Sequence, residues 1–423
     1  MRIAFVINEF PSVSETFILD QMVGLIERGH EVQIYAERPQ QMPRKLHADV
    51  ERLQMLGRTR YRELAPTGRT ARVRSGISRA LRWGWKYPGP LMDGLNVFRH
   101  GRRALNFSMV HKIFPSREPA PRCDVVHSHY GPNGVRAVYW REAGILEGPV
   151  ITTFHGYDAN MLPRTQGPEL YQKLFADADC FTAGSEFMRK RLISLGAPAE
   201  RIVKLPMGVD VRKYQCAERH RDEAGELRLL SIARLVEVKG IEYALKALAR
   251  VKPRLGRFRY QIAGDGPLLG SLKALARELG IDDAVEFLGA VSREEALGFY
   301  EQAHIFLLPS VLTETGEEEN QPVVLAEAQA AGLPVIATRI GGVPESIREG
   351  ESGLLVAPRD SEALGEAILR VAEHPERWPE MGRAGRRLVE SDFNLEKLNE
   401  RLLELYEELI CAKPTGRVTS CTT

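Results

Sequence analysis

The sequence has 423 residues, with 58 Lys or Arg against 56 Asp or Glu, a formal net charge of +2 and 43% hydrophobic residues. This length predicts two or about three domains and leaves room for a sizeable core. No stretch approaches the roughly 20 apolar residues of a membrane-spanning helix. The five scattered cysteines form no C-x-x-C pair, which argues against a disulfide framework or a zinc site.

Short apolar strands alternate with helical patterns through the first half of the chain. Residues 2–8 form the first strand and are too short for a signal-peptide core, so we expect a cytoplasmic protein. An amphipathic helix over residues 14–28 follows. Further strands are predicted at 31–36, 124–129, 149–155, 179–184 and 202–207. Continuous apolar strands that alternate with helices indicate a parallel sheet covered on both faces.

A strongly basic block, residues 44–112, interrupts this alternation. It has sixteen Lys or Arg against four acids, a charge of +12, so the remaining residues must carry −10. It also contains Trp83, Trp85, Tyr87 and Phe98. We predict an insertion at about residues 40–120 that contacts an anionic membrane surface, where each Lys or Arg contributes about 1 kcal/mol. A solvated insertion and a nucleic-acid site are the alternatives, and no recognised motif supports nucleic acid.

The pattern weakens over residues 210–226 and then restarts, which places a domain boundary near residue 215. Strands are predicted at 227–234, 259–264, 284–290, 305–310, 334–339 and 353–357. Helical patterns follow at 361–373, 375–390 and 394–410. We therefore expect two α/β domains with parallel sheets, residues 1–215 and 216–393. A helix over residues 394–411 is expected to cross back to the first domain, before a tail at 412–423.

Two glutamates eight residues apart mark the most informative candidate site. Glu319 precedes an apolar helical run, and Glu327 lies inside that run between two alanines. A carboxylate among apolar residues needs a structural partner or a ligand. The N–H groups that begin the helix beside Glu319 favour an anion. Two carboxylates that can bind hydroxyl groups on either side of an anion site suggest a sugar phosphate or a nucleotide sugar.

Further candidates follow the predicted strands of the second half, where open parallel sheets bind their ligands. Arg234 and Lys239 follow the first of these strands and suit a diphosphate, whose charge grows as a bond to it breaks. Glycine-rich turns at 264–267 and 341–345 let the backbone approach a ligand closely. Solvated cations and tight turns are the structural alternatives.

Candidates in the first half also follow predicted strands; they are Ser14, Glu15, Thr16, His155, Tyr157 and Asp158. The first three can meet the acceptor or the donor phosphate, or can serve only to cap the helix that follows. The histidine could bind a sugar or polarise a leaving group. His127 and His129 flank another strand end, but carboxylates at metal-ligand spacing are missing, so we expect no metal site.

Set together, these motifs resemble the retaining nucleotide-sugar glycosyltransferases of glycosyltransferase family 4. That family has the GT-B fold, in which two Rossmann-like domains face each other across a cleft. The resemblance covers nearly the whole chain and is strongest over residues 229–356. In order, the motifs are Ser231-Ile-Ala-Arg-Leu with Lys239-Gly240, Ala263-Gly-Asp-Gly-Pro, Phe287-Leu-Gly289, Leu308-Pro-Ser310, the two glutamates, Ala331-Gly-Leu-Pro-Val-Ile-Ala337 and Gly341-Gly-Val-Pro-Glu.

The resemblance implies a role for each candidate. Arg234 and Lys239 would hold the donor diphosphate, and Glu327 would bind the ribose hydroxyls. Glu319 would bind the hydroxyls of the transferred sugar, with His155 near that sugar and the leaving oxygen. The other donor-binding candidates are Gly266, Gly289, Val291, Asn320, Gln321, Pro322, Val323 and Val324, of which residues 289–291 would lie along the nucleobase and the amides at 323 and 324 would cradle phosphate.

The chain departs from the common family pattern at two places. Residues 10–18, Phe-Pro-Ser-Val-Ser-Glu-Thr-Phe-Ile, replace a glycine pair and are similar to a bacterial exopolysaccharide branch of colanic-acid and amylovoran type. Asn320-Gln-Pro322 replaces a glycine-rich step.

The resemblance implies retaining, metal-independent hexose transfer without a cofactor. The donor would be a nucleotide sugar, with UDP favoured, and the acceptor a saccharide or lipid-linked saccharide in surface or exopolysaccharide synthesis. A GT-B epimerase, a phosphorylase and a non-catalytic nucleotide-sugar binding protein are the alternatives.

Overall fold

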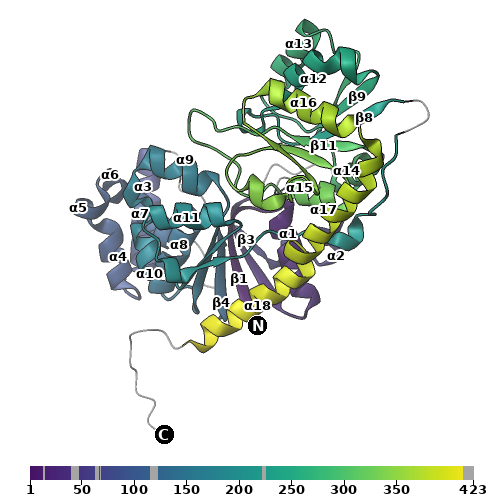
Figure 1. Ribbon diagram of the computed structural model, residues 1–423. Helices are drawn as coiled ribbons and strands as arrows, with labels where there is room; N and C mark the ends of the chain where they lie inside the picture. The colour runs from purple at the N-terminus through teal and green to yellow at the C-terminus, as the bar shows by residue number, and fades with distance from the viewer. Residues whose placement is uncertain are drawn as a thin grey trace.

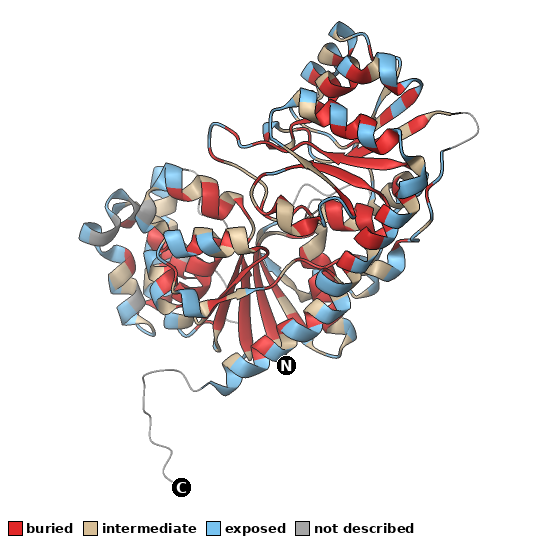
Figure 2. Ribbon diagram, viewed as in Figure 1, coloured by how far each residue is buried: buried red, intermediate tan, exposed pale blue. Residues whose placement is uncertain are grey.

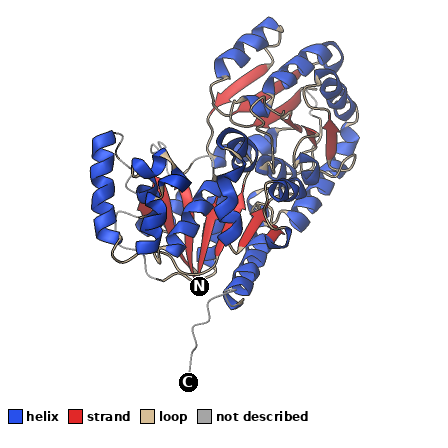
Figure 3. Cartoon of the chain, turned by 90° about the vertical axis from the view of Figure 1, so that its left-hand side faces the viewer, coloured by secondary structure: helices blue, strands red, loops and turns tan. Residues whose placement is uncertain are grey.

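The computed structural model describes residues 1–12, 15–39, 47–61, 66, 68–114, 122–221 and 225–412. It contains two parallel sheets, each in its own domain and each covered by helices (Figures 1 and 3). The two domains have the Rossmann-like architecture that the sequence predicts, so the predicted fold class is confirmed.

The N-terminal sheet has seven strands in the order β3-β2-β1-β4-β5-β6-β7. The strands are β1 Arg2–Glu9, β2 Glu31–Arg38, β3 Thr59–Tyr61, β4 Val125–His129, β5 Val150–Phe154, β6 Cys180–Ala183 and β7 Ile202–Lys204. The helices around this sheet are α1 Thr16–Glu27, α2 Ala48–Arg52, α8 Gly131–Glu142, α9 Tyr157–Gln166, α10 Gln172–Asp177 and α11 Glu186–Ser194. All strands predicted for this half are present, and the short edge strand β3 is an addition.

The C-terminal sheet has six strands in the order β10-β9-β8-β11-β12-β13. They are β8 Leu227–Ile232, β9 Phe258–Ala263, β10 Val285–Gly289, β11 Ile305–Leu308, β12 Val335–Thr338 and β13 Gly353–Val356. The helices of this domain are α12 Ile241–Leu255, α13 Leu269–Glu278, α14 Arg293–Gln302, α15 Val323–Ala330, α16 Ser361–Ala372 and α17 Trp378–Asp392. Pro375 begins a 3-10 turn and not the predicted helix, since α17 starts only at Trp378.

The central strands of both sheets are buried on both faces, as continuous apolar strands of parallel sheets require (Figure 2). In each sheet the chain adds strands first on one side of the first strand and then on the other. The order therefore reverses between β1 and β4 in the N-terminal sheet and between β8 and β11 in the C-terminal sheet, and this reversal leaves a crevice at the carboxyl ends of the strands. The two crevices face each other, and the candidate site lies there.

The first part of the basic block belongs to α2 and the edge strand β3, whereas its residues 69–113 form a group of helices at the edge of the N-terminal domain that points away from the C-terminal domain (Figure 1). They are α3 Arg69–Trp83, α4 Pro88–Leu95, α5 Val97–His100, α6 Arg102–Leu105 and α7 Ser108–Ile113. Trp83 is buried against this domain, and the buried guanidinium of Arg79 donates to the carbonyl of Phe114 at 2.9 Å. Parts of the predicted insertion lie outside the described residues.

The last helix, α18 Leu395–Cys411, crosses back from the C-terminal to the N-terminal domain, as expected (Figure 1). Leu402 and Tyr406 join the core beneath α1. The hydroxyl group of Tyr406 lies 2.5 Å from Nδ1 of His127 on β4. The other crossing between the domains, residues 205–209, runs beside the start of this helix, where Val209 pairs with Asn394. None of the helices in the described ranges is both long and apolar enough to span a membrane.

Candidate functional site

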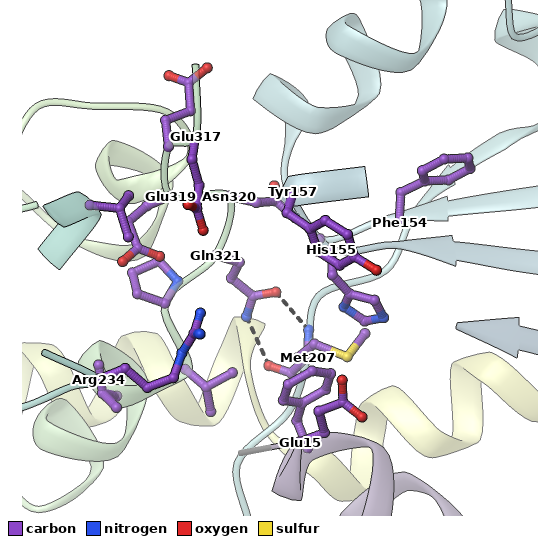
Figure 4. A pocket seen from close by; sticks show the side chains of 18 of the residues that line it. Glu15, Phe154, His155, Tyr157, Met207, Arg234, Glu317, Glu319, Asn320 and Gln321 are labelled. Carbon is purple, nitrogen blue, oxygen red and sulfur yellow. Dashed lines mark hydrogen bonds between the residues drawn. The ribbon is translucent and has the colours of Figure 1, made fainter. Parts of the chain in front are cut away.

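A cavity of about 510 Å³ lies between the two domains, at the carboxyl ends of both sheets. In Figure 4, Arg234 and Glu319 reach into it from the C-terminal domain, opposite His155 and Tyr157 of the N-terminal domain. The cavity brings together thirteen of the residues predicted from the sequence, which are Glu15, Thr16, His155, Tyr157, Arg234, Lys239, Glu319, Asn320, Gln321, Pro322, Val323, Val324 and Glu327.

The two predicted cations follow β8 on a tight turn. Lys239 ends a 3-10 turn and forms an ion pair with Glu319, whose carboxylate also accepts a hydrogen bond from Ser310 at 3.2 Å. Gly240 must be glycine, since its φ is +60° and a Cβ would lie 2.0 Å from the carbonyl oxygen of Pro309. Arg234 is exposed to the cavity, and its guanidinium has no ion pair with any described residue. Of the two cations on this turn, Lys239 is therefore paired with Glu319, whereas the guanidinium of Arg234 can bind an anion in the cavity.

The two glycine-rich turns lie behind the cavity wall and support it. A Cβ at Gly266 would lie 2.5 Å from the carbonyl oxygen of Leu235, so this glycine lets the β9 turn pack under the Arg234 turn. A Cβ at Gly341 would lie 1.8 Å from the carbonyl oxygen of Glu319, and the amide of Gly342 donates to that oxygen at 3.1 Å. Gly266, predicted to bind the donor, therefore does not line the cavity but holds the backbone that does.

The loop between Glu319 and α15 binds the other domain through its side chains. The amide group of Gln321 makes two hydrogen bonds with the backbone of Met207, accepting from its N–H at 2.7 Å and donating to its carbonyl at 2.8 Å (Figure 4). The buried Asn320 accepts a hydrogen bond from Ser185. Both side chains were predicted to bind the donor, yet in the structure their polar groups join the two domains.

Helix α15 begins at Val323 with no side-chain cap, so its first N–H groups have no side-chain partner. Val323 and Val324 line the cavity at this point, which places the positive end of the helix dipole there. Glu327 lies one turn further along and accepts a hydrogen bond from the Tyr300 hydroxyl at 2.9 Å. The cavity wall therefore carries a carboxylate about one helical turn beyond the uncapped helix start.

Three histidines form a stack that ends at the cavity: His127 and His129 on β4 are fully buried, and His155, which directly follows β5, is partly buried. The rings of His127 and His129 lie 4.6 Å apart, and those of His129 and His155 lie 5.2 Å apart. Nδ1 of His129 lies 2.9 Å from Nε2 of His155, the member that lines the cavity. Burial lowers the pKa of both His127 and His155 to about 3. Each imidazole is therefore neutral at physiological pH and can donate or accept a hydrogen bond without carrying charge.

Asp158 does not line the cavity, although the sequence suggested that it meets the acceptor. Its carboxylate is buried and accepts hydrogen bonds from the amides of His155 at 3.1 Å, Gly156 at 2.9 Å and Gly131 at 2.9 Å. It therefore fixes the turn that carries His155 and Tyr157. No group of three His, Cys, Asp or Glu side chains within the described ranges is arranged to hold a metal ion.

A second cavity, of about 500 Å³, adjoins the first, and Glu15 and Thr16 line both. Val291 lies in this second cavity together with Arg293, whereas Gly289 ends β10 just before it and lines neither. Ser14, a candidate from the sequence, lies outside the described residues. Helix α1 starts at Thr16, and its N-cap residue Glu15 makes no capping hydrogen bond, so the carboxylate of Glu15 remains directed to the site.

Several residues that line the cavity were not predicted; they include Phe17, Tyr130, Phe154, Met161 and Met207. Tyr130 directly follows β4, so the strand-end argument could have found it. Burial raises the pKa of Glu15, and a hydrogen bond from Tyr130 partly offsets that rise. Met207 belongs to the crossing between the domains, for which the sequence carried no signal.

Two family descriptions match the chain: Glycosyltransferase Family 4 over residues 14–213 and Glycosyl transferases group 1 over residues 217–388. The chain is 34% identical over 414 residues to the putative colanic acid biosynthesis glycosyltransferase WcaL of Escherichia coli, covering 97% of this chain and 100% of that one. It is 32% identical, with the same coverage, to the amylovoran biosynthesis glycosyltransferase AmsK of Erwinia amylovora.

Solved structures give the same fold at lower identity. Sucrose-phosphate synthase from Thermosynechococcus elongatus superposes with a TM-score of 0.71 at 19% identity, covering 98% of this chain and all of that one. HepE from Anabaena, in complex with UDP, superposes with a TM-score of 0.68 at 15% identity, covering 97% of this chain and all of that one.

Proposed function

The chain belongs to the family 4 glycosyltransferases, and from this premise we propose that it transfers a hexose from a nucleotide sugar to a saccharide or lipid-linked saccharide in exopolysaccharide synthesis. UDP-sugars are the first donors to test, and transfer retains the anomeric configuration without a metal ion or cofactor. We place the reaction in the cytoplasm, where nucleotide sugars are made.

One observation carries the proposal, which is the order of charges along one wall of the cavity. Glu319, the uncapped start of α15 and Glu327 follow one another, and Arg234 lines the same cavity. A nucleotide sugar has the same order: sugar hydroxyls, diphosphate and ribose hydroxyls. The carboxylates accept from hydroxyl groups, and the helix start and the guanidinium bind the diphosphate.

The geometry supports a mechanism in which this chain stabilises the leaving diphosphate. As the bond from the anomeric carbon to the diphosphate breaks, negative charge grows on the leaving oxygen. Arg234, Lys239 and the amides of α15 stabilise that charge. The acceptor enters on the same face and gives its proton to the departing diphosphate, and Glu319 holds the sugar in place. His155 supplies a neutral hydrogen bond to the sugar on the opposite wall, where a charged imidazole is disfavoured by burial.

A thermal-shift screen with UDP-, GDP- and ADP-sugars tests the donor, and product NMR with the best donor tests the stereochemistry. Stabilisation by one nucleotide series, release of nucleotide only when acceptor is present, and a retained anomeric configuration are expected. Acceptor-independent release would indicate an epimerase, and phosphate-dependent release would indicate a phosphorylase. Inversion, or activity abolished by EDTA, would refute the mechanism proposed for this site.

We also propose that helices α3 to α6 bring the enzyme to an anionic membrane surface, where a lipid-linked acceptor would reside. Five large apolar side chains there are between 64% and 104% exposed; they are Leu81, Trp85, Met92, Phe98 and Leu105. Residues 69–105, which span these helices, carry nine Lys or Arg against one acid, a charge of +8. Exposed apolar side chains within a cationic segment favour the interface of an anionic bilayer, because both burial and charge then contribute.

Sedimentation with phosphatidylcholine vesicles, with and without phosphatidylglycerol, tests this contact. The protein is expected to sediment with the anionic vesicles, and Trp85→Ser/Phe98→Ser is expected to release it. Ile193→Ser on α11 is the matched control, because it removes an exposed apolar side chain outside the block. No sedimentation of the wild-type protein at low salt, or equal loss in the control, would contradict the proposal.

A further inference from the structure

A buried ion pair joins the two domains beside the site. Nη1 of Arg293, the first residue of α14, lies 2.6 and 2.7 Å from the two carboxylate oxygens of Asp20 on α1. The side chains are only 11% and 5% exposed, so salt screens this pair weakly. Neither residue was singled out in the sequence. The pair forms only when the domains are closed, because Asp20 belongs to the N-terminal and Arg293 to the C-terminal domain.

The same guanidinium also lies in the field of the proposed ribose-binding carboxylate. Burial is the largest single influence on Arg293 and lowers its pKa, but Asp20, Tyr214 and Glu327 together outweigh burial, so the net effect is a raised pKa. Burial and the charge of Glu327 raise the pKa of Tyr214, whereas Arg293 lowers it. Asp20, Arg293, Tyr214 and Glu327 therefore form one charge network that runs from α1 of the N-terminal domain to α15.

Arg293 also carries a hydrogen-bond donor that faces no described partner. Its Nε is buried and makes no hydrogen bond to any residue that the structure describes. The side chain lines the second cavity, which adjoins the site. A buried N–H group without an acceptor is costly, so the ion pair with Asp20 has to hold this side chain at the edge of the cavity against that cost.

We propose that Asp20 is a positioning residue for donor binding. By holding Arg293 across the interface, it keeps the domains closed and keeps the positive charge of Arg293 in the field of Glu327. This inference rests on the proposed nucleotide-sugar transfer, since it names a residue that acts on the same donor. When the domains open, both charges regain water, so the contact can break and re-form during turnover.

The test compares Asp20→Asn with Glu27→Gln. Glu27 lies on the same helix and pairs with Arg52 at 2.7 Å within the N-terminal domain, so its variant removes a carboxylate of the same helix without touching the interface. Affinity for UDP and for GDP is measured by calorimetry. Asp20→Asn is expected to weaken the affinity by a coupling factor of about 5- to 150-fold, and Glu27→Gln is expected to leave it unchanged.

Two further measurements separate positioning from a loss of structure. In steady-state kinetics, Asp20→Asn is expected to raise the donor KM with little change in kcat. In small-angle scattering of the unliganded protein, it is expected to enlarge the radius of gyration, with an unchanged far-UV circular dichroism spectrum. If the Asn variant does not fold, Arg293→Lys replaces it, because lysine keeps the charge but cannot present the same planar contact.

Wild-type affinity in Asp20→Asn, or equal losses in Asp20→Asn and Glu27→Gln, would overturn the role in donor binding. An unchanged radius of gyration would overturn the role in closure whether or not nucleotide binds. A wild-type protein that binds neither UDP nor GDP and is stabilised by no UDP-, GDP- or ADP-sugar would instead overturn the proposed function, while the scattering comparison would still test the interdomain contact.

Discussion

The buried histidine stack predicts that acid weakens the N-terminal domain well before most carboxylates are protonated. His127 and His155 have their pKa lowered by burial from 6.5 to about 3, and burial also lowers the pKa of His129. Between pH 6.5 and about pH 3, these histidines bind protons in the unfolded chain but not in the folded chain. Their contribution to the free energy of unfolding is therefore fully present above about pH 6.5 and is lost as the pH falls toward about 3.

The magnitude follows from the two pKa values. For one histidine with a pKa of 6.5 in the unfolded chain and about 3 in the folded chain, lowering the pH from about 7.5 to about 5 costs about 2 kcal/mol of the free energy of unfolding. His127 and His155 together contribute about 4 kcal/mol, and His129 acts in the same direction. That loss is a large fraction of the 5–15 kcal/mol typical of a domain.

Urea unfolding at a series of pH values measures this loss, with tryptophan fluorescence as the readout because Trp83 and Trp140 lie in the N-terminal core. His127→Gln is the matched variant, because glutamine can still hydrogen-bond Tyr406 and Thr153 but does not titrate. Its stability is expected to fall by about 2 kcal/mol less than that of the wild type over this pH range. Parallel pH profiles for the two proteins would refute the reasoning.

Three further predictions concern the cavity. Arg234→Ala should lower kcat by about 10²- to 10³-fold in steady-state assays, because it removes a group that stabilises the leaving charge; wild-type turnover would refute this role. Glu327→Gln should mainly weaken nucleotide binding measured by calorimetry, and an unchanged affinity would contradict the ribose assignment. Gln321→Leu removes both hydrogen bonds that this side chain makes with the Met207 backbone and should lower the free energy of unfolding in urea by about 1–3 kcal/mol; no change in the urea midpoint would count against the interdomain contact.

The fold could be predicted from the sequence because most of its strands are buried on both faces. Continuous apolar runs such as residues 305–310 and 334–339 leave few alternatives to a central parallel strand, and β11 and β12 lie there. Strand β3 was missed because its three residues, which follow a turn at the sheet edge, are largely exposed and show no apolar run. Pro375 misled the helix prediction since a proline suits the first turn of either kind of helix.

The candidate site was predictable where a residue directly follows a strand. Arg234 and His155 lie in the cavity for that reason, and Tyr130 would have been found by the same argument. Residues whose role depends on the packing of one domain against the other were not predictable. Asp158 lies four positions after the end of β5 but points inward to the backbone amides of its own turn, which spacing alone cannot show.

Asn320 and Gln321 show why a departure from a family pattern needs a structure to be understood. As part of a donor-binding loop, they suggested contacts with the nucleotide sugar. Both residues line the cavity, and their amide groups also bind Ser185 and the crossing at Met207. Glu345, which follows the glycine pair behind this loop, accepts hydrogen bonds from the amides of α11 at 2.8 and 2.9 Å. Glycine residues in place of Asn320 and Gln321 could not make the contacts with Ser185 and Met207, because glycine has no side chain.

The two domains are joined on two sides of the cavity. On one side, Asn320 and Gln321 join the loop of Glu319 to the N-terminal domain, and on another side Asp20 and Arg293 join α1 to α14. Closure and assembly of the site are therefore the same event in this chain, because the residues that hold the domains together are neighbours of the residues proposed to hold the donor.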